Sequence, residues 1–427
     1  MTPARRLRRR KRVARVVTAF VIALCLYVVH FVSRFTAELS ANDDNHNNNH
    51  DDDDDGIGLA KDGEPWFSTP DGAVVVRSCF DRLCNLHYGA RSADGFVLRM
   101  YGAQLQMFSH RVPPPAVWHI WVAGGLQAAN RLPPKLPTTR GAHLVMNVPG
   151  SNQFASKAGL WNGLVAALGR QRAAEICPET WTKADAADLL AYGRAHPDAR
   201  FIFKFGHRQT GMQVHDATDP RLPSIVQSSV AKVIQRVQAD ALLLPNGGHV
   251  AFRTYTWFRC LPASVQARID FNSPAYLNHD NVSLISSGYT PSKGNFTSTS
   301  AFMRRFLTPL EIELMRASMR DALTGFLHSF GASMCAFASS EHLPKPDDVV
   351  CELYGFDWLP VRSTATGRVG VKLLETNRFP DMQLHSHDAS DAKDVVKVCT
   401  FARVMGHKLL AQCPPADFLT LSWSFAS

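Results

Sequence analysis

Beyond about residue 64, short apolar runs alternate with longer stretches in which apolar residues recur at helical spacing. Runs rich in β-branched and aromatic residues predict strands, and apolar residues three and four apart predict amphipathic helices. The predicted strands cover residues 141–149, 199–205, 249–261, 349–361 and 368–377. The predicted helices cover residues 157–175, 183–197, 309–331 and 391–412.

The last two predicted strands form a hairpin. The polar sequence RSTATG lies between them, and a short turn that contains Gly is typical of antiparallel neighbours. Helices interspersed with strands, together with this hairpin, indicate an α/β or α+β fold. Since domains commonly hold roughly 100–200 residues, we expect a smaller α/β domain at 64–198 and a second domain at 199–427.

The amino end predicts a membrane anchor. A basic cluster, RRLRRRKRVAR, precedes an apolar run from Val16 to Val32, which is at the short end of what spans a bilayer. Positive charge on the amino side predicts a cytoplasmic tail at 1–15, an uncleaved signal anchor at 16–33 and a single-pass type II topology. The globular part would then be lumenal, in the Golgi or secretory pathway, or extracellular. A cleaved signal or a different topology is the alternative.

A polar stalk follows the predicted anchor. Residues 34–63 contain ANDDNHNNNHDDDDDG, which has almost nothing to bury and predicts disorder. The chain of 427 residues has a net charge of +9, and most of this excess belongs to the globular part because the tail and the stalk nearly cancel. The charge suits anionic partners such as nucleotides or acidic peptides, although ordinary surface charge explains it equally well. At 45% hydrophobic residues, the chain is not wholly disordered, collagenous or a long coiled coil.

The cysteines bear on the compartment. Cys25 lies in the predicted anchor, which leaves eight of the nine cysteines in the part expected to be exported. An even number fits disulfides in an oxidising lumen without fixing their pairing, and buried reduced thiols are the alternative. The sequons at Asn281 and Asn295 would matter only in a lumenal topology.

The late hairpin carries the densest candidate chemistry. Glu375 and Asn377 are two residues apart on its second strand, so both side chains leave the same face. Pairing across the turn brings Asp357 of the first strand close to them. Two carboxylates and one amide oxygen would repel one another unless a cation lies between them, and all-oxygen ligation favours Mg²⁺. An ordinary surface of paired charges is the alternative.

Two further cations suit a phosphate. Lys204 ends an apolar strand just before a loop with Gly206 and Gly211, where an ammonium and backbone N–H groups can meet a phosphate group. Arg253 lies within an alternating strand, where an inward guanidinium would need an anionic partner.

Several segments in chain order resemble the tubulin–tyrosine ligase-like family of ATP-grasp ligases. The segments are NVPGSNQFASKAGLWN (147–162), FIFKFGHRQTG (201–211), VQSSVAKVI (226–234), NGGHVAFRTYTWF (246–258), ELYGFDW (352–358) and LLETN (373–377). The resemblance runs from about residue 141 to residue 412. It implies an ATP-grasp-like ligase domain.

The resemblance also implies roles for individual residues. Asp357, Glu375 and Asn377 would hold Mg²⁺. Lys204 and Arg253 would neutralise the phosphates of ATP and act in catalysis. Further nucleotide contacts would come from Lys157, Gly206, Gly211 and Gln227.

The reaction implied by the resemblance is ATP-dependent amide formation. A carboxylate of a protein or peptide attacks the γ-phosphate to give an acyl-phosphate, and the amine of a free amino acid then displaces phosphate. By resemblance the acidic acceptor is tubulin, but a lumenal domain would not meet cytosolic microtubules. No nucleic-acid partner is expected.

Two other functions stay open. His249 and Ala251 depart from the family pattern, which leaves room for a non-catalytic relative that binds a peptide or nucleotide. The tail, anchor and stalk are also the usual layout of a Golgi-type glycosyltransferase, although the chain has no apolar strand that ends in Asp-x-Asp.

Overall fold

The computed structural model describes residues 74–79, 104–108, 119–124, 143–146, 148, 153–204, 213–229, 231, 233–243, 249–261, 263–272, 274–278, 297–336, 348–378, 380, 392–404 and 413–425. The chain divides into two compact units, Met1–Gly56 and Ile57–Ser427, and every described residue belongs to the second unit. The predicted tail, anchor and stalk, Gly206, Gly211 and both sequon asparagines lie outside the described residues.

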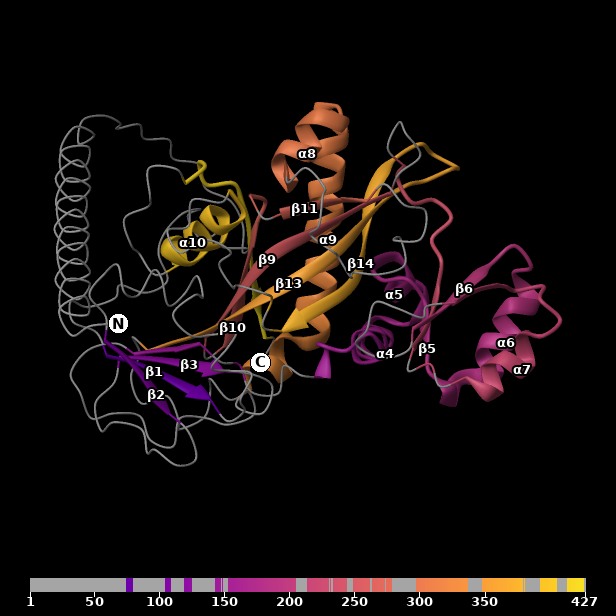
Figure 1. Cartoon of the computed structure of the whole chain (residues 1–427), viewed down its shortest axis with the longest axis horizontal. Coiled ribbons are helices and arrows are strands. Elements are labelled where there is room, and N and C mark those ends of the chain that lie inside the picture. Colours follow the sequence, from indigo (N-terminus) through magenta and orange to yellow (C-terminus); the bar gives the residue numbers. More distant parts are fainter. Residues whose placement is uncertain are drawn as a thin grey trace, which may run out of the picture. The chain divides into compact units, whose positions relative to one another are not determined.

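A mixed sheet of eleven strands is the largest element of the described structure. Its order is β12-β11-β9-β13-β4-β3-β1-β2, with β14 paired to β13, β10 to β9 and β15 to β10 (Figure 1). The strands are β1 (Val74–Cys79), β2 (Gln104–Phe108), β3 (Ile120–Gly124), β4 (Leu144–Met146), β9 (His249–Leu261), β10 (Ser264–Asp270), β11 (Pro274–Asn278), β12 (Thr297–Ser298), β13 (Val349–Arg362), β14 (Val369–Arg378) and β15 (Phe418–Ser424). Strands β1 to β4 and β13 pair in parallel, and the other pairs are antiparallel.

Helices cover both faces of this sheet. On one face, α9 (Pro309–Cys335) packs the ring of Phe326 5.5 Å from Phe258 of β9 and 5.1 Å from Phe356 of β13. On the other, α10 (Ala392–Val404) places Phe401 edge-on to Trp257 of β9 at 5.0 Å. Further helices are α4 (Lys157–Leu168), α5 (Arg170–Ile176) and α8 (Thr299–Phe306). The sheet therefore belongs to a mixed α+β architecture.

Local signals explain where α9 begins. The Thr308 hydroxyl accepts a hydrogen bond from the Glu311 backbone N–H, and the Glu311 carboxylate accepts one from the Thr308 N–H. This capping box satisfies two backbone donors, and Pro309 suits the first helical position because its missing N–H would have no partner there.

A second, four-stranded sheet has a core of its own. Its strands are β5 (Thr180–Trp181), β8 (Val233–Arg236), β6 (Arg200–Lys204) and β7 (Gln213–Asp216), in that order. The short helix η2 (Lys183–Asp185) leads into α6 (Ala186–Ala195), and α7 (Leu222–Ser228) follows β7. Phe201, Phe203 and Ile234 face the helix side, in one cluster with Leu189 and Val226.

Most of the predicted elements are confirmed. The helix predicted at 157–175 is two helices, α4 and α5, because Gly169 between them adopts φ 78°, which ordinary residues avoid. The predicted helix at 391–412 is observed as α10, and residues 405–412 lie outside the described part. The expected domain boundary near residue 198 falls between α6 and β6, within the unit Ile57–Ser427.

Among the described residues, four cysteines form two disulfides. Cys260 of β9 is bonded to Cys335 of α9, and Cys399 of α10 is bonded to Cys413. Cys177 and Cys351 are buried thiols without a disulfide partner. The sequence left the pairing open, and the tertiary structure selects these partners.

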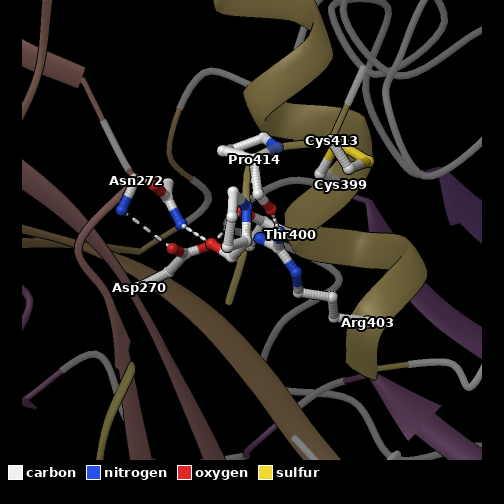
Figure 2. Close-up of a disulfide and its surroundings, with 8 residues drawn as sticks. Asp270, Asn272, Cys399, Thr400, Arg403, Cys413 and Pro414 are labelled. Atoms are coloured by element: carbon white, nitrogen blue, oxygen red, sulfur yellow. Dashed lines mark hydrogen bonds and ion pairs between the residues drawn. A yellow bond between two sulfur atoms is a disulfide. The ribbon is translucent and has the colours of Figure 1, made fainter. Parts of the chain in front are cut away.

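Figure 2 shows the second disulfide beside a group of polar residues that also links α10 to neighbouring segments. Asp270, at the end of β10, accepts hydrogen bonds from the Thr400 hydroxyl at 2.7 Å and the Asn272 backbone N–H at 2.9 Å. Arg403 donates to the backbone carbonyl of Pro414, the residue that follows the Cys413 half of the disulfide. The segment before β15 is therefore held to α10 covalently and by hydrogen bonds.

None of the helices in the described ranges is both long and apolar enough to cross a membrane.

Candidate functional site

Three adjacent strands bring the predicted site residues together. Across the hairpin, Asp357 of β13 lies directly opposite Glu375 of β14. The last pair of the antiparallel β9–β13 ladder is Trp257 and Leu353. Arg253 lies four residues before Trp257, and Asp357 lies four residues after Leu353, so both extend beyond the same end of the ladder. A guanidinium and two carboxylates therefore form a row across β9, β13 and β14.

A β-bulge aims the second carboxylate. Asp357 pairs with Glu375, but the next residue, Trp358, pairs with Leu373. Leu374 therefore has no partner on β13 and is the extra residue of the bulge. Leu373 belongs to the main core under α9, and an unbroken alternation would send Glu375 into that core. The extra residue turns Glu375 and Asn377 to the opposite face of the sheet.

Hydrogen bonds fix the carboxylates closely. The Arg253 guanidinium grips Asp357 with two bonds, Nε to Oδ1 and Nη2 to Oδ2, both 2.7 Å. The Asn377 amide donates to Asp357 Oδ2 at 3.1 Å and to Glu375 Oε1 at 3.2 Å. Lys157 forms an ion pair with the other Glu375 oxygen. Since the Asp357 and Glu375 side chains are only 5% and 9% exposed, these contacts act in a shielded environment.

Gly355 gives the arginine room. A Cβ atom at this position would lie 3.3 Å from the Arg253 side chain and 3.1 Å from Pro380, which is closer than most real Cβ contacts. Gly355 therefore leaves space for the Arg253 side chain to reach Asp357.

Burial weakens the charge of the two lysines. Lys157 is the first residue of α4, and burial lowers its pKa. The negative charge of Asp357 partly offsets this decrease, and the positive charge of Arg253 adds to it. Burial lowers the pKa of Lys204 to about 7, and the positive charge of Lys157 adds to this shift. Both ammonium groups would gain from a further anion, because an anion restores the charged form.

Lys204 comes from the second sheet and faces the first. Its Nζ donates to Gln235 Oε1 at 2.7 Å, and Gln235 in turn donates to the Thr180 hydroxyl at 3.1 Å. Lys204 and Gln235 line a small cavity of about 20 Å³ together with Leu359 of β13 and Leu374 of β14. The cavity has room for roughly one water, so the two sheets meet closely at this point.

Gln235 was not identified as a site residue from the sequence. Gln227 was named instead, and it does not line the cavity beside Lys204. Gln227 is exposed on α7, and among the described residues no hydrogen bond joins it to Lys204 or Arg253. Gln235 is 2% exposed, and it alternates with Ile234, which faces the opposite side of β8. A glutamine directly after the apolar pair Val233 and Ile234 in a short strand was the available signal. Gly206 and Gly211 lie outside the described residues.

A second polar network fixes the same strands from the other face. Arg378 of β14 bonds to both oxygens of Glu352 and donates to the Val148 carbonyl at 3.0 Å. Tyr354 and the Val148 N–H also donate to Glu352, at 3.0 and 2.8 Å. This buried ion pair locks β13 to β14 beside Asp357.

The side-chain oxygens at this site are the type of ligand that binds a hard cation. Two carboxylates and an amide converge, which is the oxygen chemistry that Mg²⁺ prefers. Within the described ranges no group of three or more His, Cys, Asp or Glu side chains is arranged to hold a metal. A cation at this site would therefore use Asp357, Glu375 and the amide oxygen of Asn377, with phosphate oxygens or water completing its coordination.

Comparisons with known proteins do not classify the chain. No model of a known protein family matches it, and no characterised protein matches its sequence.

Proposed function

We propose that this protein is an ATP-dependent carboxylate–amine ligase of the tubulin–tyrosine ligase-like, ATP-grasp type. The observation that carries the proposal is the row of Arg253, Asp357 and Glu375 on one sheet, with the half-buried Lys157 and Lys204 beside it. The carboxylates could bind a metal ion, and the arginine and lysines could bind phosphate groups. These groups lie close to where the two sheets face each other.

The charges in the site support binding of a nucleotide with its metal. Asp357 and Glu375 are now neutralised by Arg253 and Lys157. Asp357, Glu375 and the amide oxygen of Asn377 would hold a magnesium ion bound with ATP, and the ion would neutralise charge on the transferred phosphoryl group. Arg253 and Lys157 would then be available to the phosphate oxygens. Lys204, which now bonds to the neutral Gln235, would gain an anionic partner.

The reaction joins a protein carboxylate to an amino acid. The acceptor carboxylate oxygen attacks the γ-phosphorus, the bond to ADP breaks, and an acyl-phosphate forms. The uncharged amine then attacks the acyl carbon, phosphate leaves with the bonding electrons, and the nitrogen loses a proton. Arg253 and Lys204 would hold the phosphoryl oxygens in line, so the proposal needs little acid–base chemistry from the protein.

The disulfides favour an exported acceptor. Disulfides persist in oxidising compartments and are rare in the cytosol. Cys260–Cys335 and Cys399–Cys413 both lie in the same unit as the candidate site. We therefore infer that the domain works in the secretory pathway or outside the cell, on an acidic polypeptide other than cytosolic microtubules.

The first experiment measures nucleotide binding to the full chain. In a thermal shift assay, ATP with Mg²⁺ should raise the melting temperature of the wild type, and Asp357→Asn should abolish this shift because it removes a metal ligand. Asp321→Asn, an exposed carboxylate on α9, is the matched control and should keep the shift. Binding that needs no Mg²⁺, or that survives Asp357→Asn unchanged, would overturn the proposal.

A further inference from the structure

Strand β14 uses its two faces differently beside the candidate site. Glu375 and Asn377 lie on the face with Asp357. Thr376, between them in sequence, pairs across the hairpin with Phe356, which belongs to the core under α9. Paired residues share a face of the sheet, so the Thr376 side chain points away from the site and toward α9. Thr376 is 2% exposed, and no step of the proposed reaction uses it.

The Thr376 hydroxyl bonds to the segment that leads into α4. It donates to the backbone carbonyl of Phe154, three residues before Lys157. Phe154 is fully buried, and its ring lies 5.0 Å from that of Phe326 and 5.2 Å from that of Phe330, both on α9. The hydrogen bond is itself buried, so water does not readily replace it.

The short stretch from Phe154 to Lys157 carries this anchor to the start of the helix. Ser156 caps α4 by accepting the Gly159 N–H at 3.0 Å. A Cβ atom on Gly159 would lie only 1.8 Å from the backbone oxygen of Gln153, so the first turn of α4 packs tightly against the residue before Phe154. Lys157 is the first residue of the helix. The position of the Phe154 carbonyl therefore sets the position of the Lys157 backbone.

A second side chain on the same face of β14 holds the segment further upstream. Arg378 donates to the Val148 carbonyl at 3.0 Å, and Glu352 accepts the Val148 N–H at 2.8 Å. These bonds lie six residues before Phe154, so they hold the beginning of the segment. Thr376 holds its end, next to α4.

We propose that Thr376 is a positioning residue for Lys157: from the face of β14 opposite the site it fixes the start of α4, and the helix then brings the Lys157 ammonium to Glu375. A lysine that is already ordered loses less conformational entropy when a phosphate binds. The benefit for phosphate binding rests on the proposed function. The positioning itself rests on the contacts of Thr376 and can be tested without a nucleotide.

The test measures the accessibility of single lysines in the full chain in detergent. Brief treatment with acetic anhydride, followed by mass spectrometry, gives the acetylation rate of each lysine relative to the exposed Lys183. Thr376→Val removes the hydroxyl at nearly constant shape and should raise the rate at Lys157 about tenfold, because the released ammonium leaves its shielded ion pair. Thr376→Ser keeps the hydroxyl and should stay within about twofold of the wild type. Lys204, on the second sheet, should react equally in all variants.

Thr256→Val is the matched control. Thr256 is fully buried on β9, and its hydroxyl lies 3.4 Å from that of Thr254 and not at the segment before α4. This variant should leave the acetylation of Lys157 unchanged. Titration of ATP with Mg²⁺ in thermal shift assays links the positioning to function: Thr376→Val should weaken the apparent affinity about fivefold, whereas Asp357→Asn should abolish binding.

Several results would overturn the proposal. Unchanged acetylation of Lys157 in Thr376→Val, whatever its melting temperature, would reduce Thr376 to a packing role. A similar rise in Thr376→Ser would exclude the hydroxyl as the cause, and equal rises at Lys157 and Lys204, or in Thr256→Val, would mean general loosening of the fold. Failure of the wild type to bind nucleotide would overturn the proposed function alone, because the acetylation of Lys157 does not depend on it.

Discussion

Lys204 shows how burial changes the chemistry of a single side chain. Its ammonium has one neutral hydrogen-bond acceptor, Gln235, and lies near the positive charge of Lys157. The protonated form is therefore poorly stabilised, and the pKa of Lys204 falls to about 7. At neutral pH the group is only partly charged, and an arriving phosphate would restore the full charge.

The low pKa of Lys204 predicts a pH-dependent effect of its removal. Between pH 7 and about 10 the unfolded chain binds this proton and the folded protein does not, so the free energy of unfolding contributed by Lys204 rises with pH. Lys204→Met should therefore stabilise the fold more at pH 6.5 than at pH 9, measured by urea unfolding at both values. Lys183→Met, at an exposed position, should show no such difference, and the reverse trend for Lys204→Met would refute the buried-lysine interpretation.

At the scale of elements, the site depends on how β14 is built. Val369, Val371 and Leu373 alternate into the main core, whereas Leu374 packs with Leu359 in a smaller cluster on the opposite side. One residue beyond the regular ladder reverses the faces of everything after it. The bulge therefore decides whether Glu375 is buried among apolar residues or presented to Asp357.

Deleting Leu374 tests whether the bulge acts only by setting the face of Glu375. Without Leu374, Glu375 directly follows the core-facing Leu373, so simple alternation itself presents Glu375 to Asp357. The full chain should therefore keep magnesium-dependent nucleotide binding and lose about 2–3 kcal/mol of stability through the lost packing of Leu374. Glu375→Leu is the contrasting variant and should lose nucleotide binding, which thermal shifts with and without ATP and Mg²⁺ measure. Loss of nucleotide binding on deletion of Leu374 would show that the bulge does more than set the face of Glu375.

At the scale of the whole molecule, two crosslinks join distant parts of the fold. Cys260–Cys335 ties the large sheet to α9, and Cys399–Cys413 ties α10 to the segment before β15. Closing a loop of about 15 residues stabilises a fold by about 3 kcal/mol in the chain-entropy account. Both crosslinks would stabilise this unit in the oxidising compartment that we propose for it.

The thiol chemistry of the protein in cells tests the compartment. Protein isolated in the presence of N-ethylmaleimide should yield the two disulfide-linked peptide pairs in mass spectrometry. Cys177 and Cys351 serve as internal controls: burial raises the pKa of each thiol to about 12, so both should be alkylated only after denaturation. Recovery of Cys260, Cys335, Cys399 and Cys413 as alkylated thiols would place the domain in a reducing compartment.

The sequence identified the parts of the site that depend on local pattern. The alternation in β9 and β13 and the short turn between β13 and β14 predicted the strands that hold Arg253, Asp357 and Glu375. Gln235 could not be found in this way, since its importance comes from Lys204 on the neighbouring strand. Likewise, β10 and β15 were not predicted as partners, because their pairing joins residues far apart in the chain.

The sequence by itself determined the strands that carry the site, the longer helices, the turn of the hairpin and the kinds of side chain that the site could use, because backbone preference and apolar spacing act between near neighbours. Only the tertiary structure decided the direction of Glu375, the bonding of Lys204 to Gln235 and the partners of the disulfides. Each of these depends on strand register and on the packing of one sheet against another, and such contacts are made between residues that no local pattern connects.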